Sequence, residues 1–273
     1  MRVQPTRRSF CRDILAPALV FACAISLGAA QELTRYLDLQ SDDFTKAEMA
    51  RSDIEAALAA NGGTGSVDLS GRRLNGVDLS GLDLTRAKLQ AARLNRANLA
   101  DAKLDGVVLD QAWALDADLT GATLRGASLF GTQLMGAKLD RADLSGARIT
   151  GDLSRASLRG ARLDGADLSA DPHNQSMGLM RGVLRSAKLD GASLERANLS
   201  RTLLEFASLR NASLRGAKLS GAELGGADLS EADVADADFD HADVTSTRLI
   251  GLRGRDRARN LDRAKNLDRA FQH

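Results

Sequence analysis

The sequence predicts an all-β solenoid, a chain that winds in stacked coils and turns a corner every five residues. Three observations lead to this prediction. An apolar residue recurs every five positions from Leu69 onward, alanine usually stands two positions before it, and Gly, Ser, Asp, Asn and Arg fill most other positions. Aromatic residues make up only 3% of the 273 residues, so the core must be built from small aliphatic side chains.

The five-residue period is regular enough to be counted. Between Leu69 and Leu249 there are 36 apolar centres, of which 31 are leucine, and alanine fills 25 of the 36 positions two residues before them. One residue is dropped after Ile149, and after an interruption we expect the count to resume at Leu179. This run of tandem matches indicates one repeat domain over residues 64–250.

Neither a helix nor a single strand can bury this pattern. On a helix, five residues advance about 500°, so successive leucines would be spread around every side. On one strand, an odd spacing would alternate the leucines between the two faces. If the chain turns a corner every five residues, each centre can point to the axis. Alanine then lies beside the centre, where a larger side chain would clash. Stacked coils would then share backbone hydrogen bonds at about 4.8 Å, the spacing found between strands.

The repeat Ala-(Asp/Asn)-Leu-x-x resembles the motif of the pentapeptide repeat family over residues 67–250. Clear copies are Ala97-Asn98-Leu99, Ala142-Asp143-Leu144 and Ala227-Asp228-Leu229. The resemblance implies a right-handed quadrilateral parallel β-helix, whereas the spacing alone does not distinguish four sides from three. With four sides, the 36 centres would make about nine coils.

Residues 1–30 have the layout of a secretory signal peptide, and we expect the protein to be periplasmic or secreted. A basic start precedes an apolar run over 14–30 that ends in small residues. Residues 6–12 also resemble the twin-arginine export motif, except that Cys11 stands where leucine is usual. Removal of the signal would leave no stable membrane span and would take away both cysteines, Cys11 and Cys23. The alternative is a membrane anchor through uncleaved residues 14–30.

Each end of a coil stack is an unpaired apolar edge, so we expect a cap at both. For the first end we predict a capping segment over residues 31–63. It would contain one helix over 42–63, with a capping box between Thr45 and Glu48. Phe44 would pack against Met49 at the start of the helix, and Gly62 and Gly63 would end it. Leu37 and Leu39 would help the helix to plug the first coil. The alternative is a helix that binds a partner.

The other end is basic. Residues 251–273 are predicted to form a basic C-terminal cap or tail. Within it, residues 258–271 repeat with a period of six residues and favour a short helix that closes this end of the stack. From Arg248 to the end there are eight basic and three acidic residues, so we expect this segment to lie against acidic coils.

Two local faults interrupt the repeat. Residues 170–182 contain Pro172, which cannot donate to a backbone ladder, and they predict a loop or bulge. His173, Met177 and Met180 in this loop could ligate a soft metal, but we favour a loop that has lost its register. Trp113 stands beside Ala114, a centre that is smaller than leucine. Trp113 would either pack over the depression that this small centre leaves or form an exposed aromatic contact.

Acidic residues gather late in the repeat, at the outward position before each centre. If a coil has four sides, Glu223 and Asp243 should fall on one side in adjacent coils. We predict a candidate interaction surface that contains Trp113, His173 and five of these acidic residues. The acidic residues are Glu223, Asp228, Asp233, Asp238 and Asp243.

We interpret the chain as a non-enzymatic, exported scaffold that binds an unidentified protein partner, with a homodimer as an alternative. It needs no cofactor or metal, and we assign no catalytic residue. The lack of a sustained basic face with aromatics argues against nucleic-acid binding.

Two other functions stay open. The resemblance includes proteins that mimic DNA and bind DNA gyrase, but lysines and arginines here interrupt the acidic surface that mimicry needs. Some parallel β-helices are carbohydrate-active enzymes. However, aspartate is so frequent at outward positions that carboxylate pairs arise by chance, and aromatic sugar platforms are lacking.

Overall fold

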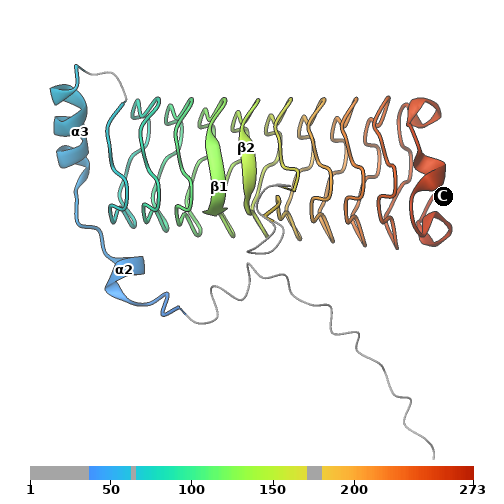
Figure 1. The fold of residues 1–273 in the computed structure, drawn as a ribbon, viewed down its shortest axis with the longest axis horizontal. Coiled ribbons are helices and arrows are strands. Elements are labelled where there is room, and N and C mark those ends of the chain that lie inside the picture. The colour runs from blue at the N-terminus through green and yellow to red at the C-terminus, as the bar shows by residue number, and fades with distance from the viewer. Residues whose placement is uncertain (1–36, 63–65, 171–179) are drawn as a thin grey trace, which may run out of the picture.

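The protein is a straight stack of coils closed by different structures at its two ends (Figure 1). The computed structural model describes residues 37–62, 66–170 and 180–273. Regular elements are few, because most of each coil is held by isolated bridges and turns. They are the helices α2 (Asp42–Thr45) and α3 (Arg51–Ala60), the strands β1 (Ser128–Gln133) and β2 (Arg148–Asp152), and the 3-10 turns η1 (Arg255–Arg257), η2 (Leu261–Arg263) and η3 (Leu267–Arg269).

The backbone ladder gives each coil four sides. Parallel bridges join residues 20 positions apart, as in Asp68 with Lys88, and the next bridge begins five residues later. Four steps of five residues therefore complete one coil. We name the sides walls A, B, C and D after their first bridged residues, which are Asp68, Arg73, Asp78 and Asp83 in that order.

The interior confirms the predicted arrangement of leucine and alanine. Every described centre from Leu69 to Leu249 is at most 3% exposed, and Leu144 and its neighbour Ala142 are fully buried. The interior is lined mainly by one leucine and one small residue per side, so burial of apolar surface is spread evenly along the rod.

Aspartate or asparagine at the outward position stabilises the corner that follows it. Asp78 Oδ1, for example, accepts a hydrogen bond of 3.0 Å from the amide of Ser80. The corner then turns through a residue with positive φ, such as Gly81 at 66° or Arg86 at 58°. The Asp/Asn of the repeat therefore satisfies a backbone donor that the turn would leave without a partner.

Two steps of the stack differ from five residues. Between Ile149 and Leu153 one residue is missing, and here the chain runs as the extended strand β2, parallel to β1. After Asp167 on wall A, the next bridge position on wall B is Val183, which pairs with Asp152 over 31 positions. Among the described residues, the ladder thus passes from the side of Leu168 to the side of Leu184. The predicted resumption at Leu179 therefore falls outside the described residues, and the count of about nine coils stays a prediction.

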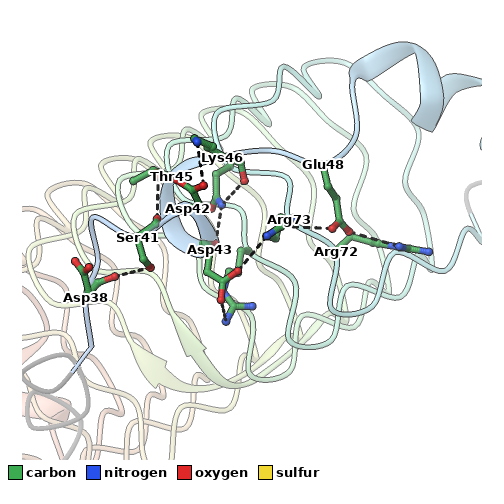
Figure 2. A network of polar contacts seen from close by, with 11 residues as sticks. Asp38, Ser41, Asp42, Asp43, Thr45, Lys46, Glu48, Arg72 and Arg73 are labelled. Atoms are coloured by element: carbon green, nitrogen blue, oxygen red, sulfur yellow. Dashed lines mark hydrogen bonds and ion pairs between the residues drawn. The ribbon is translucent and has the colours of Figure 1, made fainter.

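The prediction of a single helix over residues 42–63 is wrong, because α2 ends at Thr45 and α3 begins only at Arg51. The chain leaves helix α2 because Ala47 forms an antiparallel bridge with Leu74 and the amide of Glu48 donates to the carbonyl of Arg73 at 2.9 Å. Figure 2 shows this stretch lying against the coils. Backbone pairing with the rod therefore overrides the local tendency to continue the helix.

The capping box and the part predicted for Leu37 in the plug differ from their predictions. The Thr45 hydroxyl donates to the backbone carbonyl of Ser41, the residue before α2, at 2.9 Å. Helix α3 begins instead where the Asp53 carboxylate accepts the Ala50 amide at 2.8 Å. Ile54 of α3 is fully buried against the core, whereas the side chain of Leu37 is 40% exposed and does not help to plug it.

The C-terminal segment forms a wider last coil instead of a helix. Arg253, Arg259, Lys265 and Phe271 continue the ladders of walls D, A, B and C in steps of six residues, with a 3-10 turn in each step. The expected pairing with the acidic coil is present, since Arg263 lies 3.1 Å from Asp240. Among the described residues, no helix has the length and apolar character required to span a bilayer.

Candidate interaction surface

Wall B differs from the other walls because the N-terminal segment, residues 37–62, covers it in the first coils. Phe44 of α2 is buried, and its ring meets the ring of Trp113 edge-on at 5.1 Å. The guanidinium of Arg93 lies over the Phe44 ring at 4.9 Å. Asp43 pairs with Arg73 at 3.1 Å (Figure 2). Trp113 therefore packs under the N-terminal segment and is not the exposed aromatic contact of the alternative interpretation.

Buried asparagines fasten the same segment to the corner after wall B. Asn75 donates to the carbonyls of Asp43 and Lys46, each at 3.0 Å. Asn95 donates to the carbonyl of Phe44 at 3.3 Å. Because these amides are almost fully buried, each needs such a partner, and the segment supplies it.

Further along the rod, wall B is free of this segment, and we name its last part the distal face. It comprises Leu203, Glu223 and Asp243 on the wall, Arg201, Gly221 and His241 on the corner before it, and Phe206, Gly226 and Ser246 on the corner after it. Arg181 reaches along the face, donating to Glu223 at 3.1 Å and to the carbonyl of Arg201 at 3.1 Å. Leu203, between these coils, is only 2% exposed.

A shallow hollow of about 560 Å³ lies at the first corner of the distal face. Its lining residues are Arg181, Arg201, Ser220, Gly221, Asp240, His241 and Lys265. Asp240 Oδ1 lies 3.0 Å from His241 Nδ1 and 3.1 Å from a guanidinium nitrogen of Arg263. Among the described residues, neither Arg201 nor Lys265 forms an ion pair within 4 Å, although Lys265 attracts its bridge partner Asp243. The hollow therefore presents two cations that an acidic group could reach.

Phe206 stands at the opposite corner of the distal face and is 65% exposed. It adopts φ 59°, a left-handed conformation that is strained for a bulky side chain. Its ring lies over Gly226, where a Cβ would come within 2.7 Å of the ring. Beside it, Glu205 and Arg185 form a half-buried pair at 2.8 Å. The phenylalanine is thus held outward from a rigid base.

The structure brings together only two of the predicted acidic residues. Glu223 and Asp243 are bridge partners on wall B, as predicted for a four-sided coil. Asp228, Asp233 and Asp238 lie on walls C, D and A, facing other directions. His173 lies outside the described residues.

Four of the five predicted acids cap corners. Asp228, Asp233, Asp238 and Asp243 each accept the amide two residues later, at 2.9 to 3.1 Å. Glu223 makes no such contact and pairs with Arg181 instead. Glu223 is therefore the acid of this set whose carboxylate is not engaged by its own corner.

The corner contacts shift the titration of these carboxylates. The amide of Asn260, followed by the backbone amide of Asp240, lowers the pKa of Asp238 below its usual value. For Asp243, burial acts to raise the pKa, but the hydroxyl and amide of Thr245 and the amide of Asn266 together lower it. Both groups are therefore ionised at neutral pH and help to hold the last coil.

Basic side chains neutralise the acids along the other walls. On wall D, Lys103 lies 3.4 Å from Asp83, and on wall C, Lys138 lies 3.3 Å from Asp118. Within the described walls, the adjacent pair Glu223 and Asp243 is the longest run of acids in one ladder. No described wall presents the continuous negative stripe of a DNA duplex.

Sequence reasoning missed Phe206, Arg181 and Arg201. A signal for Phe206 was present, because glycine or a polar residue usually fills the corner position two residues after a centre. Arg181 gave no such signal, since its role depends on where the chain returns to wall B. The described residues contain no group of three His, Cys, Asp or Glu side chains that could hold a metal.

Comparisons with known proteins agree with this architecture. The profile of the family described as pentapeptide repeats (8 copies) matches residues 66–99, 115–151, 152–170, 183–216 and 207–245, more than half of the chain. HetL, a pentapeptide repeat protein involved in regulating heterocyst differentiation in the cyanobacterium Nostoc sp. strain PCC 7120, is 29% identical, with 82% of this chain and 95% of HetL covered and a TM-score of 0.57.

Two further solved structures are more distant in shape. A pentapeptide repeat protein of the Arabidopsis thaliana thylakoid lumen is 33% identical, with 41% of this chain and 71% of that chain covered and a TM-score of 0.22. QnrB1, a plasmid-mediated fluoroquinolone resistance protein, is 19% identical, with 77% of this chain and 92% of that chain covered and a TM-score of 0.42. No curated protein matches the sequence.

Proposed function

Because this chain belongs to the pentapeptide repeat family, we propose that it acts as an exported, non-enzymatic scaffold that binds a protein partner through the distal face. Members of this family form right-handed quadrilateral β-helices and are generally structural or interaction proteins. A four-sided rod of this kind holds its outward side chains at fixed spacings, which suits recognition of an extended protein surface.

The exposed ring of Phe206 is the observation that carries the proposal. Exposed aromatic side chains are frequent anchors of protein interfaces, because they bury a large area at little entropic cost. The backbone strain at Phe206 gives the fold no benefit that glycine would not give better. A strained residue that places an aromatic ring in solvent supports a role in binding.

The hollow indicates the chemistry of the partner. Arg201 and Lys265 would attract a carboxylate, while Phe206 would contact an apolar group across the width of wall B. We therefore propose a partner that presents an acidic side chain next to an apolar one. Export rests on the basic start and apolar run of residues 1–30, and it would place this partner outside the cytoplasm.

The test compares two corner variants in cells. Phe206→Gly removes the ring and relieves the strain, while Arg196→Gly makes the same backbone change at a corner of wall D. Cross-linking to the wild-type protein identifies candidate partners, and the affinity of each purified candidate is then measured. We expect Phe206→Gly to weaken the true partner about 30-fold, as for an aromatic hot spot, and Arg196→Gly to leave it unchanged.

Three outcomes would contradict the proposal. Equal affinity of both variants for every purified partner would exclude the distal face. A specific cross-link to a second copy, lost in Phe206→Gly, would make the partner another molecule of this chain. Recovery of the protein from the cytosol alone would exclude export, and inhibition of gyrase supercoiling at micromolar protein would then favour the DNA-mimic alternative.

A further inference from the structure

The first part of wall B takes its ion-pair partners from the N-terminal segment. Arg73 lies 3.1 Å from Asp43 and 3.4 Å from Glu48, and Arg72 lies 3.5 Å from Glu48. Arg93 lies 3.8 Å from Asp43. In the part of the chain that the structure describes, these three arginines have no other acidic partner within 4 Å, so the coils themselves leave their charges unbalanced.

The N-terminal segment contacts the coils in the way that a bound peptide does. Ala47 adds to the edge of the first coil through an antiparallel bridge with Leu74, and the Glu48 amide donates to the same coil at 2.9 Å. Strand addition is a common mode of peptide recognition, in which main-chain bonds supply affinity and side-chain pockets supply specificity. Asn75 and Asn95 bind three further main-chain carbonyls of the segment. A nucleic acid has no such backbone, so this surface suits a peptide.

An aromatic ring next to an acidic side chain supplies the specificity. Phe44 is 8% exposed, with its ring 5.1 Å from the ring of Trp113 and 4.9 Å from the guanidinium of Arg93. Asp43 directly precedes it and pairs with Arg73. Because aromatic and arginine side chains dominate the hot spots of protein interfaces, this acidic and aromatic pair is the part of the segment that the site selects.

The segment does not use the whole site. Arg93 Nε is a buried donor that has no hydrogen-bond partner among the described residues. The distance of 3.8 Å between Arg93 Nη2 and Asp43 Oδ2 exceeds the length of a hydrogen bond. Helix α2, which carries Phe44, has four residues and is too short to be stable without the coils. A peptide that places its carboxylate closer to Arg93 can therefore displace this stretch of the segment.

We propose that the first part of wall B is a peptide-binding site, which residues 41–48 of the same chain occupy when no ligand is present. Its ligand is an extended peptide in which an acidic residue directly precedes an aromatic one. The residues that form the site are Arg73, Asn75, Arg93, Asn95 and Trp113. As a tethered competitor at an effective concentration on the order of 1 mM, the segment lowers the affinity for such a ligand. The site goes beyond the function proposed for the distal face and does not depend on it.

A labelled copy of the segment tests the proposal on the full chain. The probe is a synthetic peptide with the sequence of residues 38–49, DLQSDDFTKAEM, whose binding is followed by fluorescence anisotropy. Phe44→Ala loosens the tethered copy and leaves the site itself intact, so we expect this chain to bind the probe about 10-fold more tightly than the wild type. Phe271→Ala, which removes an exposed phenylalanine at the other end of the rod, should bind it as weakly as the wild type.

A second pair of variants tests the residues of the site. In the Phe44→Ala chain, Arg93→Gln removes the guanidinium that faces both the acid and the ring, and the probe should bind about 10-fold more weakly. Arg248→Gln, which removes a guanidinium 5.8 Å from the Phe271 ring, should have no effect. A probe with alanine in place of its phenylalanine should not bind detectably. Phe206→Gly should bind the intact probe as the wild type does, which separates this site from the distal face.

Exchange in the wild type is measured through Trp113, the single tryptophan of the chain. A probe with 4-nitrophenylalanine at its aromatic position quenches a tryptophan that it contacts. We therefore expect saturable quenching of Trp113 that the unlabelled peptide reverses. This measurement also decides the question if a variant does not fold.

Four results would overturn the proposal. Three of them are equal affinity of the wild type and Phe44→Ala for the probe, equal binding of the probe that contains alanine, and constant Trp113 emission with the quenching probe. The fourth is displacement of the probe by a single-stranded oligonucleotide as readily as by the unlabelled peptide, because this would show attraction by charge alone.

Discussion

At the scale of single residues, each position of the repeat has one physical task, and the tasks explain the composition. Leucine fills the axis, alanine lies beside it, and Asp or Asn accepts the corner amide, as Asp78 does for Ser80. A residue that departs from its task is therefore informative. Gly151, in the inward position that alanine usually holds, and Phe206, at a corner, are two such departures.

We predict that Gly151→Ala destabilises the protein, because the added Cβ would overlap Thr132 O and lie 3.0 Å from Thr132 N. The backbone of two paired coils would have to separate, at a cost of about 1–3 kcal/mol. The change should appear as a lower midpoint of urea unfolding.

Gly146→Ala is the matched control for this substitution. Gly146 has φ 66° and no atom within 4 Å of an added Cβ, so it tests backbone strain without a clash. We expect about 1 kcal/mol from strain. A larger effect at Gly146 than at Gly151 would show that close approach of the coils is not limiting.

Inward positions have no room for charge, so Leu144→Lys should lower stability by about 3–5 kcal/mol through an unpaired buried ammonium. Thr123→Lys, at an outward position of wall D beside Asp143, should change stability by less than about 0.5 kcal/mol. Thermal melts followed by circular dichroism separate the two. Equal melting temperatures would contradict the assignment of inside and outside.

At the scale of elements, the N-terminal segment depends on the rod more than on its own helices. Helix α2 has four residues, and Phe44 holds it against Trp113. The segment continues through the bridge of Ala47 with Leu74 to α3, whose buried Ile54 covers the first coil. Its attachment is therefore a tertiary contact that is separable from the coil ladder.

We predict that Phe44→Ala exposes Trp113 and shifts its fluorescence emission to longer wavelength, because the edge-on ring contact is lost. The coils should remain folded, since their ladder does not pass through the segment. Phe271→Ala, a change of an exposed phenylalanine at the other end of the rod, should leave the emission unchanged. Unchanged emission in Phe44→Ala would mean that other contacts hold the segment in place.

The sequence predicted the coils better than it predicted the caps, and the reason is physical. The repeat contains the same pattern of inward and outward residues many times, so an error at one position does not change the predicted coil. The caps occur once, and local signals such as Thr45 and Glu48 compete with tertiary pairing that only the folded rod provides. The same limit applies to the distal face, where only the coil geometry brings Arg181 and Phe206 to the same wall.

At the scale of the whole molecule, the corner carboxylates make stability depend on pH. Eight described aspartates at outward positions have a lowered pKa, each with a hydrogen bond from the residue two positions later: Asp68, Asp78, Asp83, Asp118, Asp143, Asp233, Asp238 and Asp243. The unfolded chain, with ordinary pKa values, binds more protons in acid. The folded state therefore loses this stabilisation as pH falls.

We predict that the free energy of unfolding is nearly constant at neutral pH and decreases below about pH 5, through the range in which lowered carboxylate pKa values lie. Urea unfolding at pH 7 and pH 3.5 measures the difference. Asp238→Asn should reduce it, because its bond with Asn260 then carries no charge. Greater stability at pH 3.5 than at pH 7 would contradict the role of the carboxylates.

The long step in the ladder from Asp167 to Val183 has a consequence for engineering. The bridge of Asp152 with Val183 spans 31 positions instead of 20, yet wall B regains its normal spacing at Leu203. Alignment in this molecule is therefore set by the coil already in place, and not by the length of chain between coils. A foreign peptide inserted between Asp167 and Val183, or a duplicated cassette of one full circuit, should be accommodated while the remaining circuits keep their stacking.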